Sequence, residues 1–368
     1  MAALNRLPRL LLLLAALFFL ILGLFAGLMR LGWNWPWARP MVAVNHGPLM
    51  ICGFLGTLIS LERAVALGRS WGYAAPAIVG VGTLGLVAGI SAKSAMLLIM
   101  FGSLVLVFIF IAVLLRQPAL YTATMSLGAG AWLAGNVLLL TGITIPRMVH
   151  WWIGFLVLTI VGERLELNRL LAPSRYTKST FGITLALFLA GLICTSFLSV
   201  RGDRIAGVGM LAMALWLARY DVARLTVHRA GLPRFIAVSL FAGYGWLGVG
   251  GLIWALAVPV DAVGSFSFVM YDAMLHSIFL GFVFSMIFAH APIIFPAVAG
   301  RPLAFRRVFY SHLGLLHLSL VGRVAGDLSG WFWLFRWAGL WNVIALVLFL
   351  ANSVYGMVAG QHERALKS

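Results

Sequence analysis

The amino-acid sequence predicts an all-α membrane protein with about twelve transmembrane helices. Of its 368 residues, 63% are hydrophobic and only 10% are charged, and the mean hydropathy is +1.05, so the chain has too little polar surface to cover a soluble globule. Its apolar runs are about 18 to 25 residues long and show no alternation of polar and apolar residues. Such runs are typical of helices, which satisfy their backbone groups internally, as a bilayer requires.

The apolar runs define the predicted spans in order. The first, 9–29, resembles a signal peptide, but its apolar core is long enough to cross a bilayer and no small-residue cleavage site follows it, so we expect a membrane anchor. The remaining spans are predicted at 41–61, 73–92, 95–115, 119–141, 148–168, 180–200, 203–221, 234–257, 269–293, 307–326 and 331–357.

The basic residues predict the orientation of these spans. Of the 26 Lys and Arg residues, six lie in the loops after odd-numbered spans and two lie within the last two spans, so the other 18 lie at the termini and in the loops after even-numbered spans. Because cytoplasmic loops carry the excess of basic residues, both termini are expected in the cytoplasm. The net charge of +17 comes from these loops. The expected partner is therefore the lipid bilayer, and no nucleic-acid partner is expected.

One sequence pattern occurs three times, in the second, sixth and tenth spans. It reads GFLGTLISLER at 53–63, GFLVLTIVGER at 154–164 and GFVFSMIFAHA at 281–291. Because the copies are four spans apart and run in the same direction, we expect a pseudo-threefold arrangement of four-helix units within a single membrane domain, 1–368. The repeat units extend roughly over 9–115, 119–221 and 234–357.

A histidine precedes each Gly-Phe pair. His46, His150 and His276 lie seven, four and five residues before the glycine, so their depths differ by only about 4.5 Å along the helix axis, near the outer face. A single histidine in a membrane helix often bonds only a backbone carbonyl, but three at one depth favour the binding of a metal ion or haem. Haem b is the expected cofactor, because neutral imidazole is its usual axial ligand.

Helical geometry narrows the choice of ligands. At 100° per residue, His46 and His150 lie within about 60° of each other relative to the Gly-Phe frame, whereas His276 is rotated by about 160° from His46. A pocket between two neighbouring helices therefore suits His46 with His276, and His150 is a further ligand or a group beside the site. Asp272, four residues before His276, is a candidate acceptor for the ring proton on the nitrogen that does not bind metal, and a purely structural role for it stays open.

Titratable residues also occur nine residues after each Gly-Phe glycine. They are Glu62, Glu163 and His290, near the predicted cytoplasmic face. For the two glutamates, ion pairing with the arginines that follow them or with basic loops is favoured, and the alternative is a point where protons enter. His290 is about 21 Å along the helix from the outer histidine, too far to share one metal ion. A less favoured arrangement pairs His290 with His312 or His317 of the eleventh span.

Other residues that often carry chemistry are expected to serve packing. Cys52 and Cys194 lie inside apolar runs, so neither a disulfide framework nor a zinc site is expected. Trp151 and Trp152 are expected in the aromatic belt at the membrane interface. The chain contains no Gly-rich phosphate loop and no nucleophile elbow.

The chain resembles the catalytic subunits of the haem-copper oxidases and nitric oxide reductases. The shared features are twelve helices in a threefold arrangement, termini inside, and an outer His-Gly on the second helix, here within NHGPLM at 45–50. The resemblance implies that His46 and His276 hold a haem and that His150 lies on a helix that contributes a copper ligand. The seventh span lacks the histidine pair of that superfamily, and Ile278 stands in place of its second helix-ten histidine. Oxygen reduction at a binuclear centre is therefore not expected.

A closer resemblance is to the NnrS family of twelve-helix membrane proteins. Three groups of residues match. The first is a histidine followed by a methionine and a Gly-Phe pair, at His46, Met50, Gly53 and Phe54. The second is a Leu-His ahead of a glycine, at Leu275 and His276, and the third is a histidine six residues before an arginine, at His317 and Arg323. This resemblance implies haem b, copper as a further candidate cofactor, and the bacterial inner membrane. It also implies a role in the response to nitric oxide or in its detoxification, with nitric oxide or another small diatomic as a partner.

The expected function is therefore haem binding near the periplasmic side through His46 and His276. The alternative is a proton-coupled transporter in which Glu62, Glu163 and His290 form a titratable ring near the cytoplasm. A membrane assembly factor is a third interpretation. The sequence names neither a reaction nor a redox partner.

Overall fold

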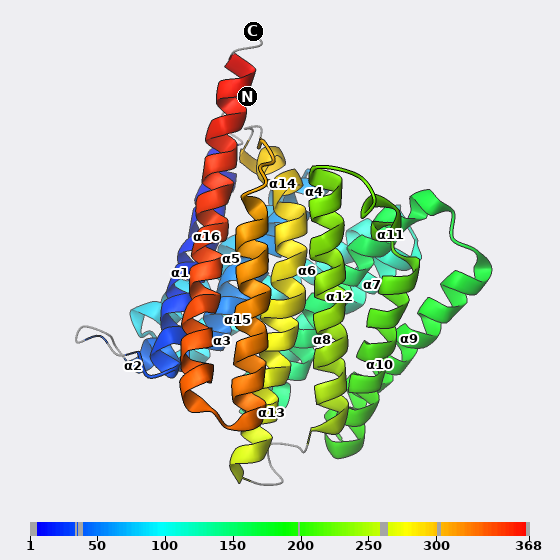
Figure 1. Cartoon of the computed structure of the whole chain (residues 1–368). Coiled ribbons are helices and arrows are strands. Elements are labelled where there is room, and N and C mark those ends of the chain that lie inside the picture. The colour runs from blue at the N-terminus through cyan, green and yellow to red at the C-terminus, as the bar shows by residue number, and fades with distance from the viewer. Residues whose placement is uncertain are drawn as a thin grey trace. The chain divides into compact units, whose positions relative to one another are not determined.

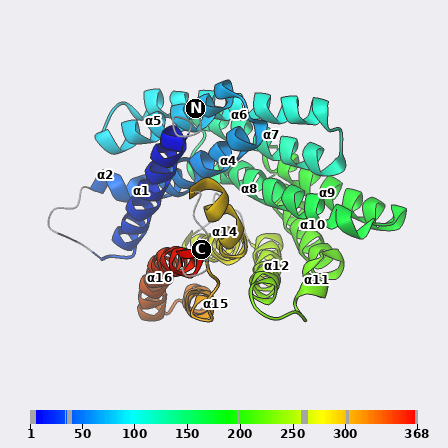
Figure 2. The same ribbon diagram turned by 90° about the horizontal axis from the view of Figure 1, so that it is seen from above.

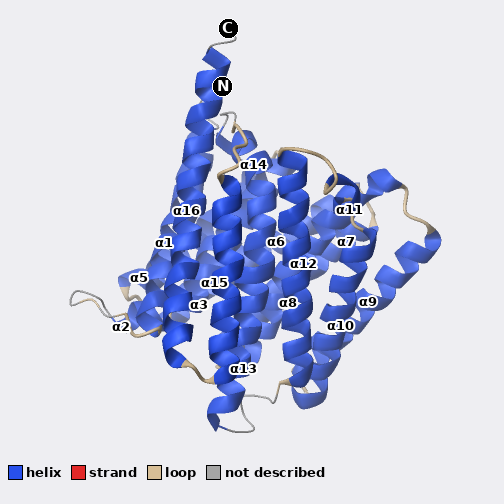
Figure 3. Ribbon diagram, viewed as in Figure 1, coloured by secondary structure: helices blue, strands red, loops and turns tan. Residues whose placement is uncertain are grey.

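The computed structural model describes residues 6–33, 35, 40–197, 199–257, 264–299 and 303–365, and every regular element within them is a helix (Figure 3). The all-α prediction is therefore confirmed for this part of the chain. Parts of the predicted domain 1–368, and residue 198 of the predicted span 180–200, lie outside the described residues.

The chain divides into two compact units, Met1–Glu166 and Leu167–Ser368. Figure 1 colours the elements along the chain and Figure 2 shows them from above. In the second unit α9 and α10 lie side by side, and so do α15 and α16, in both views. These neighbours follow each other in sequence, as short connections between antiparallel helices require.

Helices of the first unit cover most of its described length. Its elements are α1 (Arg6–Arg30), α2 (Pro40–Val44), α3 (His46–Pro48), the π-helix η1 (Leu49–Gly56), α4 (Thr57–Leu67), the 3₁₀-helix η2 (Ser70–Tyr73), α5 (Ala74–Ala88), α6 (Ala92–Arg116), α7 (Leu120–Leu140) and α8 (Ile145–Asn168), whose last two residues belong to the second unit.

The second unit is also helical throughout its described regular elements. These are η3 (Arg169–Leu171), α9 (Arg175–Thr195), α10 (Ser199–Tyr220), α11 (Ala223–Thr226), α12 (Leu232–Leu256), α13 (Gly264–His276), the π-helix η4 (Ser277–Phe284), α14 (Ser285–Ala299), α15 (Phe309–Ser329) and α16 (Phe332–Ala365).

Ten helices in the described residues are long and apolar enough to cross a membrane. Two further predicted spans, 203–221 and 307–326, form α10 and α15 but are not among the ten, because polar residues such as Asp203 and Arg323 lower their apolar content. The predicted helices are therefore present, and the membrane length is confirmed for ten of them. The number of twelve crossings stays a prediction.

The second predicted span, 41–61, is displaced in the structure. The chain turns at Asn45, which has non-helical backbone angles (φ −88°, ψ 11°), and the long helix runs from His46 to Leu67. It ends where Gly68 adopts φ +69°, a left-handed conformation that glycine tolerates. Glu62 therefore lies inside this helix, one turn before its end.

The second and tenth predicted spans contain matching π-helical segments. η1 and η4 each run from four residues before the glycine of a Gly-Phe pair to three residues after it, around Gly53 and Gly281. The third copy of the pattern, at Gly154, lies in a regular α-helix. A π-helix is rare and its hydrogen bonds reach five residues along the chain. The angles calculated above at 100° per residue therefore do not hold for His46 and His276, because η1 and η4 separate them from their glycines.

Candidate functional site

His276 is held by the half-buried Asp272 and the buried Arg323 in the second unit. Its Nδ1 lies 2.9 Å from the backbone oxygen of Asp272 and 3.1 Å from Asp272 Oδ2. The same Oδ2 accepts a hydrogen bond of 2.9 Å from Arg323 Nη2, and the Arg323 side chain is only 7% exposed. Because Nδ1 donates its proton to Asp272, the lone pair of the imidazole lies on Nε2. The contact expected between Asp272 and His276 is present.

Arg323 enters this arrangement from α15. Its guanidinium carbon lies 4.7 Å from the centre of the Phe335 ring, and the buried Asp327 lies one turn further along the same helix. The resemblance to the NnrS family singled out Arg323 only by its spacing from His317. In the structure Arg323 forms an ion pair with Asp272, which is 51 positions away, and no local sequence pattern predicts this contact.

His46 occupies the corresponding position in the first unit, at the start of α3. Its Nδ1 lies 2.8 Å from the carbonyl oxygen of Gly23 in α1. The ring packs against Gly27, where an added Cβ would lie 3.0 Å from His46 Cε1. Glycine thus lets the imidazole approach the α1 backbone closely. With Nδ1 donating to the carbonyl, the lone pair of His46 also lies on Nε2.

His150 lies on α8 and is half-buried. The location of Trp152, two residues further along α8, differs from the sequence prediction. Trp152 is 0% exposed, and its Nε1 donates a 3.0 Å hydrogen bond to Asn136 Oδ1 on α7. The expectation of an interfacial belt is therefore wrong for Trp152, because a buried amide satisfies its N–H inside the first unit.

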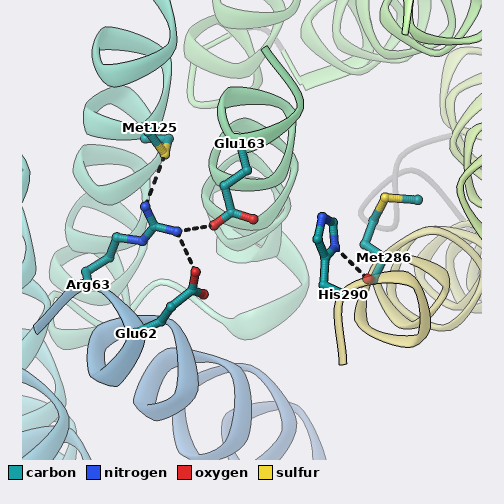
Figure 4. Close-up of polar contacts among 6 residues, drawn as sticks. All are labelled: Glu62, Arg63, Met125, Glu163, Met286 and His290. Carbon is teal, nitrogen blue, oxygen red and sulfur yellow. Dashed lines mark hydrogen bonds and ion pairs between the residues drawn. The ribbon is translucent and has the colours of Figure 1, made fainter. Parts of the chain in front are cut away.

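The three other candidate histidines of the second unit each have a partner at Nδ1. His290 Nδ1 lies 2.7 Å from the Met286 carbonyl oxygen, as Figure 4 shows. His312 Nδ1 lies 3.0 Å from Asn352 Nδ2, and His317 Nδ1 accepts a 3.0 Å bond from Trp246 Nε1. The pairing of His290 with His312 or His317 stays a prediction.

The two glutamates of the Gly-Phe frame meet at one arginine in the first unit. Arg63 Nη2 on α4 lies 2.8 Å from Glu62 Oε1 and 2.6 Å from Glu163 Oε1 on α8. Arg63 Nη1 also contacts Met125 Sδ on α7 at 3.7 Å. Figure 4 shows both carboxylates directed at this guanidinium. The ion pairing expected from the sequence is present, but Glu163 pairs with Arg63 of another helix.

The described residues contain no group of three or more His, Cys, Asp or Glu side chains that is arranged to hold a metal ion. A haem b has a smaller requirement, because the porphyrin supplies four ligands and the protein supplies one or two axial groups. An imidazole whose Nδ1 is fixed by an oxygen and whose lone pair lies on Nε2 fits that role. His276 and His46 meet this condition, and so does His290.

None of the curated proteins compared with the chain matches it. A family model described as a domain of unknown function, DUF8744, matches residues 9–358, which is nearly the whole chain. The chain therefore belongs to the DUF8744 family.

Proposed function

We propose that this protein binds haem b in a bacterial inner membrane, with His276 and His46 as axial ligands. One observation carries the proposal: each histidine has its Nδ1 fixed by an oxygen acceptor and precedes a π-helical segment of the same Gly-Phe frame. The acceptor is the Gly23 carbonyl for His46, three residues before η1, and Asp272 for His276, directly before η4. π-helical segments occur frequently at functional sites.

Asp272 and Arg323 support His276 as the stronger ligand. A carboxylate that accepts the Nδ1 proton orients the ring and raises the basicity of Nε2. Arg323 keeps that carboxylate ionised and in place by a 2.9 Å bond. A haem bound here would supply an iron that binds a diatomic molecule when one axial position is open, or transfers electrons when both are filled.

The proposed setting is a multi-pass protein with twelve crossings and both termini in the cytoplasm. Ten membrane-length helices and the distribution of basic residues support it. The proposed role is the response to nitric oxide or its detoxification, which the resemblance to the NnrS family supports. Copper near His150 is part of the same proposal.

The visible spectrum of the purified protein tests the haem proposal. The wild-type protein should show a Soret band that is lost in His276→Ala and in His46→Ala. His228→Ala, in the loop before α12, is the control and should keep the band. A colourless wild-type protein without bound iron would overturn the proposal and favour the proton-coupled transporter. A band that survives both ligand substitutions would reject these two ligands.

Copper is tested separately by metal analysis of the same preparations. A stoichiometric copper content that falls in His150→Ala, with the Soret band unchanged, would support a copper site at His150. Copper content that does not depend on His150 would reject it.

A further inference from the structure

Buried polar side chains with unused hydrogen-bonding capacity line one interface of the first unit, between η1–α4, α7 and α8. Ser60 and Asn136 are 0% exposed and Thr159 is 1% exposed. The Oγ of Ser60, the Oγ1 of Thr159 and the Nδ2 of Asn136 have no hydrogen-bond partner among the described residues. Three polar groups at this interface are thus buried and can each form a further hydrogen bond.

The side of η1–α4 that bears Ser60 faces α7. Gly56 and Arg63 lie four residues before and three residues after Ser60, which places all three on one helix face. A Cβ on Gly56 would lie 2.4 Å from the Trp132 ring, and Arg63 contacts Met125. Ser60 therefore lies between two points of contact with α7.

Thr159 reaches the same level from α8. An added Cβ on Gly128 of α7 would lie 2.9 Å from Thr159 Oγ1, and Gly128 lies between Met125 and Trp132 in sequence. Thr159 is four residues before Glu163, so the two share a face of α8. Ser60 is two residues before Glu62 and Thr159 is four residues before Glu163, so both hydroxyls lie deeper in the helices than the carboxylates that bind Arg63.

Asn136 forms the inner end of this row of polar groups. It lies eleven residues from Met125 along α7, about 16 Å by helical rise and about half of the hydrocarbon thickness. Its Oδ1 accepts the Trp152 Nε1 proton at 3.0 Å and lies 4.0 Å from Cys52 Sγ. Trp132 lies between Gly128 and Asn136 on α7, where it stacks on Phe155 of α8 at 4.6 Å between ring centres and packs against Gly56.

Such groups are costly unless they bind water. A buried donor or acceptor left unsatisfied costs about 1–3 kcal/mol, and the bilayer core offers no solvent to compensate. Internal water molecules satisfy such groups with two to four hydrogen bonds each. Glu62 and Glu163 lie at the other end of this row of polar groups, on the predicted cytoplasmic side. Their side chains are 32% and 20% exposed, so they connect the row to solvent.

We propose that this interface is a hydrated half-channel, which binds water from the Glu62–Arg63–Glu163 cluster to Asn136. Asn136, Trp152 and Cys52 close the inner end. This inference stands on the first unit alone and does not depend on haem binding.

Hydroxyl-radical labelling of the full-length protein in lipid nanodiscs tests the half-channel. Radicals formed by X-rays from bound water oxidise neighbouring Met and Trp side chains, and mass spectrometry locates the products. Met125 and Trp132 are 2% and 0% exposed, so they should be labelled only if water lies beside them. Met213 in α10, 0% exposed, is the dry reference.

Substitutions at Thr159 then distinguish labelling by bound water from labelling by transient opening of the helix packing. Thr159→Val should abolish labelling of Trp132, whereas Thr159→Ser, which keeps the hydroxyl, should retain it. Thr124→Val is the matched control, because the Thr124 hydroxyl bonds its own helix at the Leu120 carbonyl, 2.8 Å away. Labelling of Met125 and Trp132 no faster than that of Met213, or equal labelling in all three Thr variants, would overturn the proposal.

Discussion

Replacing Arg63 with glutamine tests how the first unit holds two carboxylates in membrane-length helices. Arg63 Nη2 lies 2.8 Å from Glu62 and 2.6 Å from Glu163, and only 13% of its side chain is exposed. The substitution removes both ion pairs and leaves the two carboxylates without their shared cation. Removing one partner of a buried ion pair costs about 3–5 kcal/mol, mainly because a charge is left uncompensated.

The two carboxylates are expected to contribute unequally. The Glu62 side chain is 32% exposed, so its ion pair should behave as a surface pair worth about 0–1 kcal/mol. Glu163 is 20% exposed and forms the shorter bond, so it should contribute about 2 kcal/mol, within the range for hydrogen bonds to charged groups. Arg63→Gln should therefore lower the free energy of unfolding by about 3 kcal/mol.

Reversible unfolding in mixed detergent micelles, followed by circular dichroism, measures these differences. A triple variant with glutamine at 62, 63 and 163 should recover most of the loss, because no unpaired charge remains. Arg116→Gln, at an exposed position at the end of α6, is the control and should have little effect. An Arg63→Gln variant as stable as the wild type, or a triple variant no more stable than Arg63→Gln, would refute this account of the cluster.

Two further substitutions probe the second unit by the same unfolding assay. Gly281→Ala in η4 should lower the free energy of unfolding by about 1–3 kcal/mol, because the added Cβ would lie 2.4 Å from the Trp246 ring of α12. Gly245→Ala is the control and should not destabilise the protein, because its added Cβ would meet open space. Equal effects of the two substitutions would contradict this packing. Asp272→Asn should cost about 2–4 kcal/mol, because Arg323 loses its carboxylate at 2.9 Å. Unchanged stability in Asp272→Asn would show that the pair does not hold α13 against α15.

Composition and local spacing were enough to predict the helices. A helix in a bilayer must satisfy its own backbone, so long apolar runs in this sequence have one regular solution. Helices occur at the predicted positions, except that the second is displaced to His46–Leu67. The contact of Asp272 with His276 was predictable for the same reason, because residues four apart share a helix face. The repeated Gly-Phe frame predicted a repeated helix but no π-helix, and two of its three copies are π-helical in the structure.

Only the tertiary structure decided which distant side chains meet. Arg323 pairs with Asp272 across 51 residues, and Arg63 pairs with Glu163 across 100. Those choices depend on which helix faces pack together, and an apolar run has similar hydropathy on every face. The buried Trp152 likewise finds its hydrogen-bond acceptor, Asn136, on a different helix, α7.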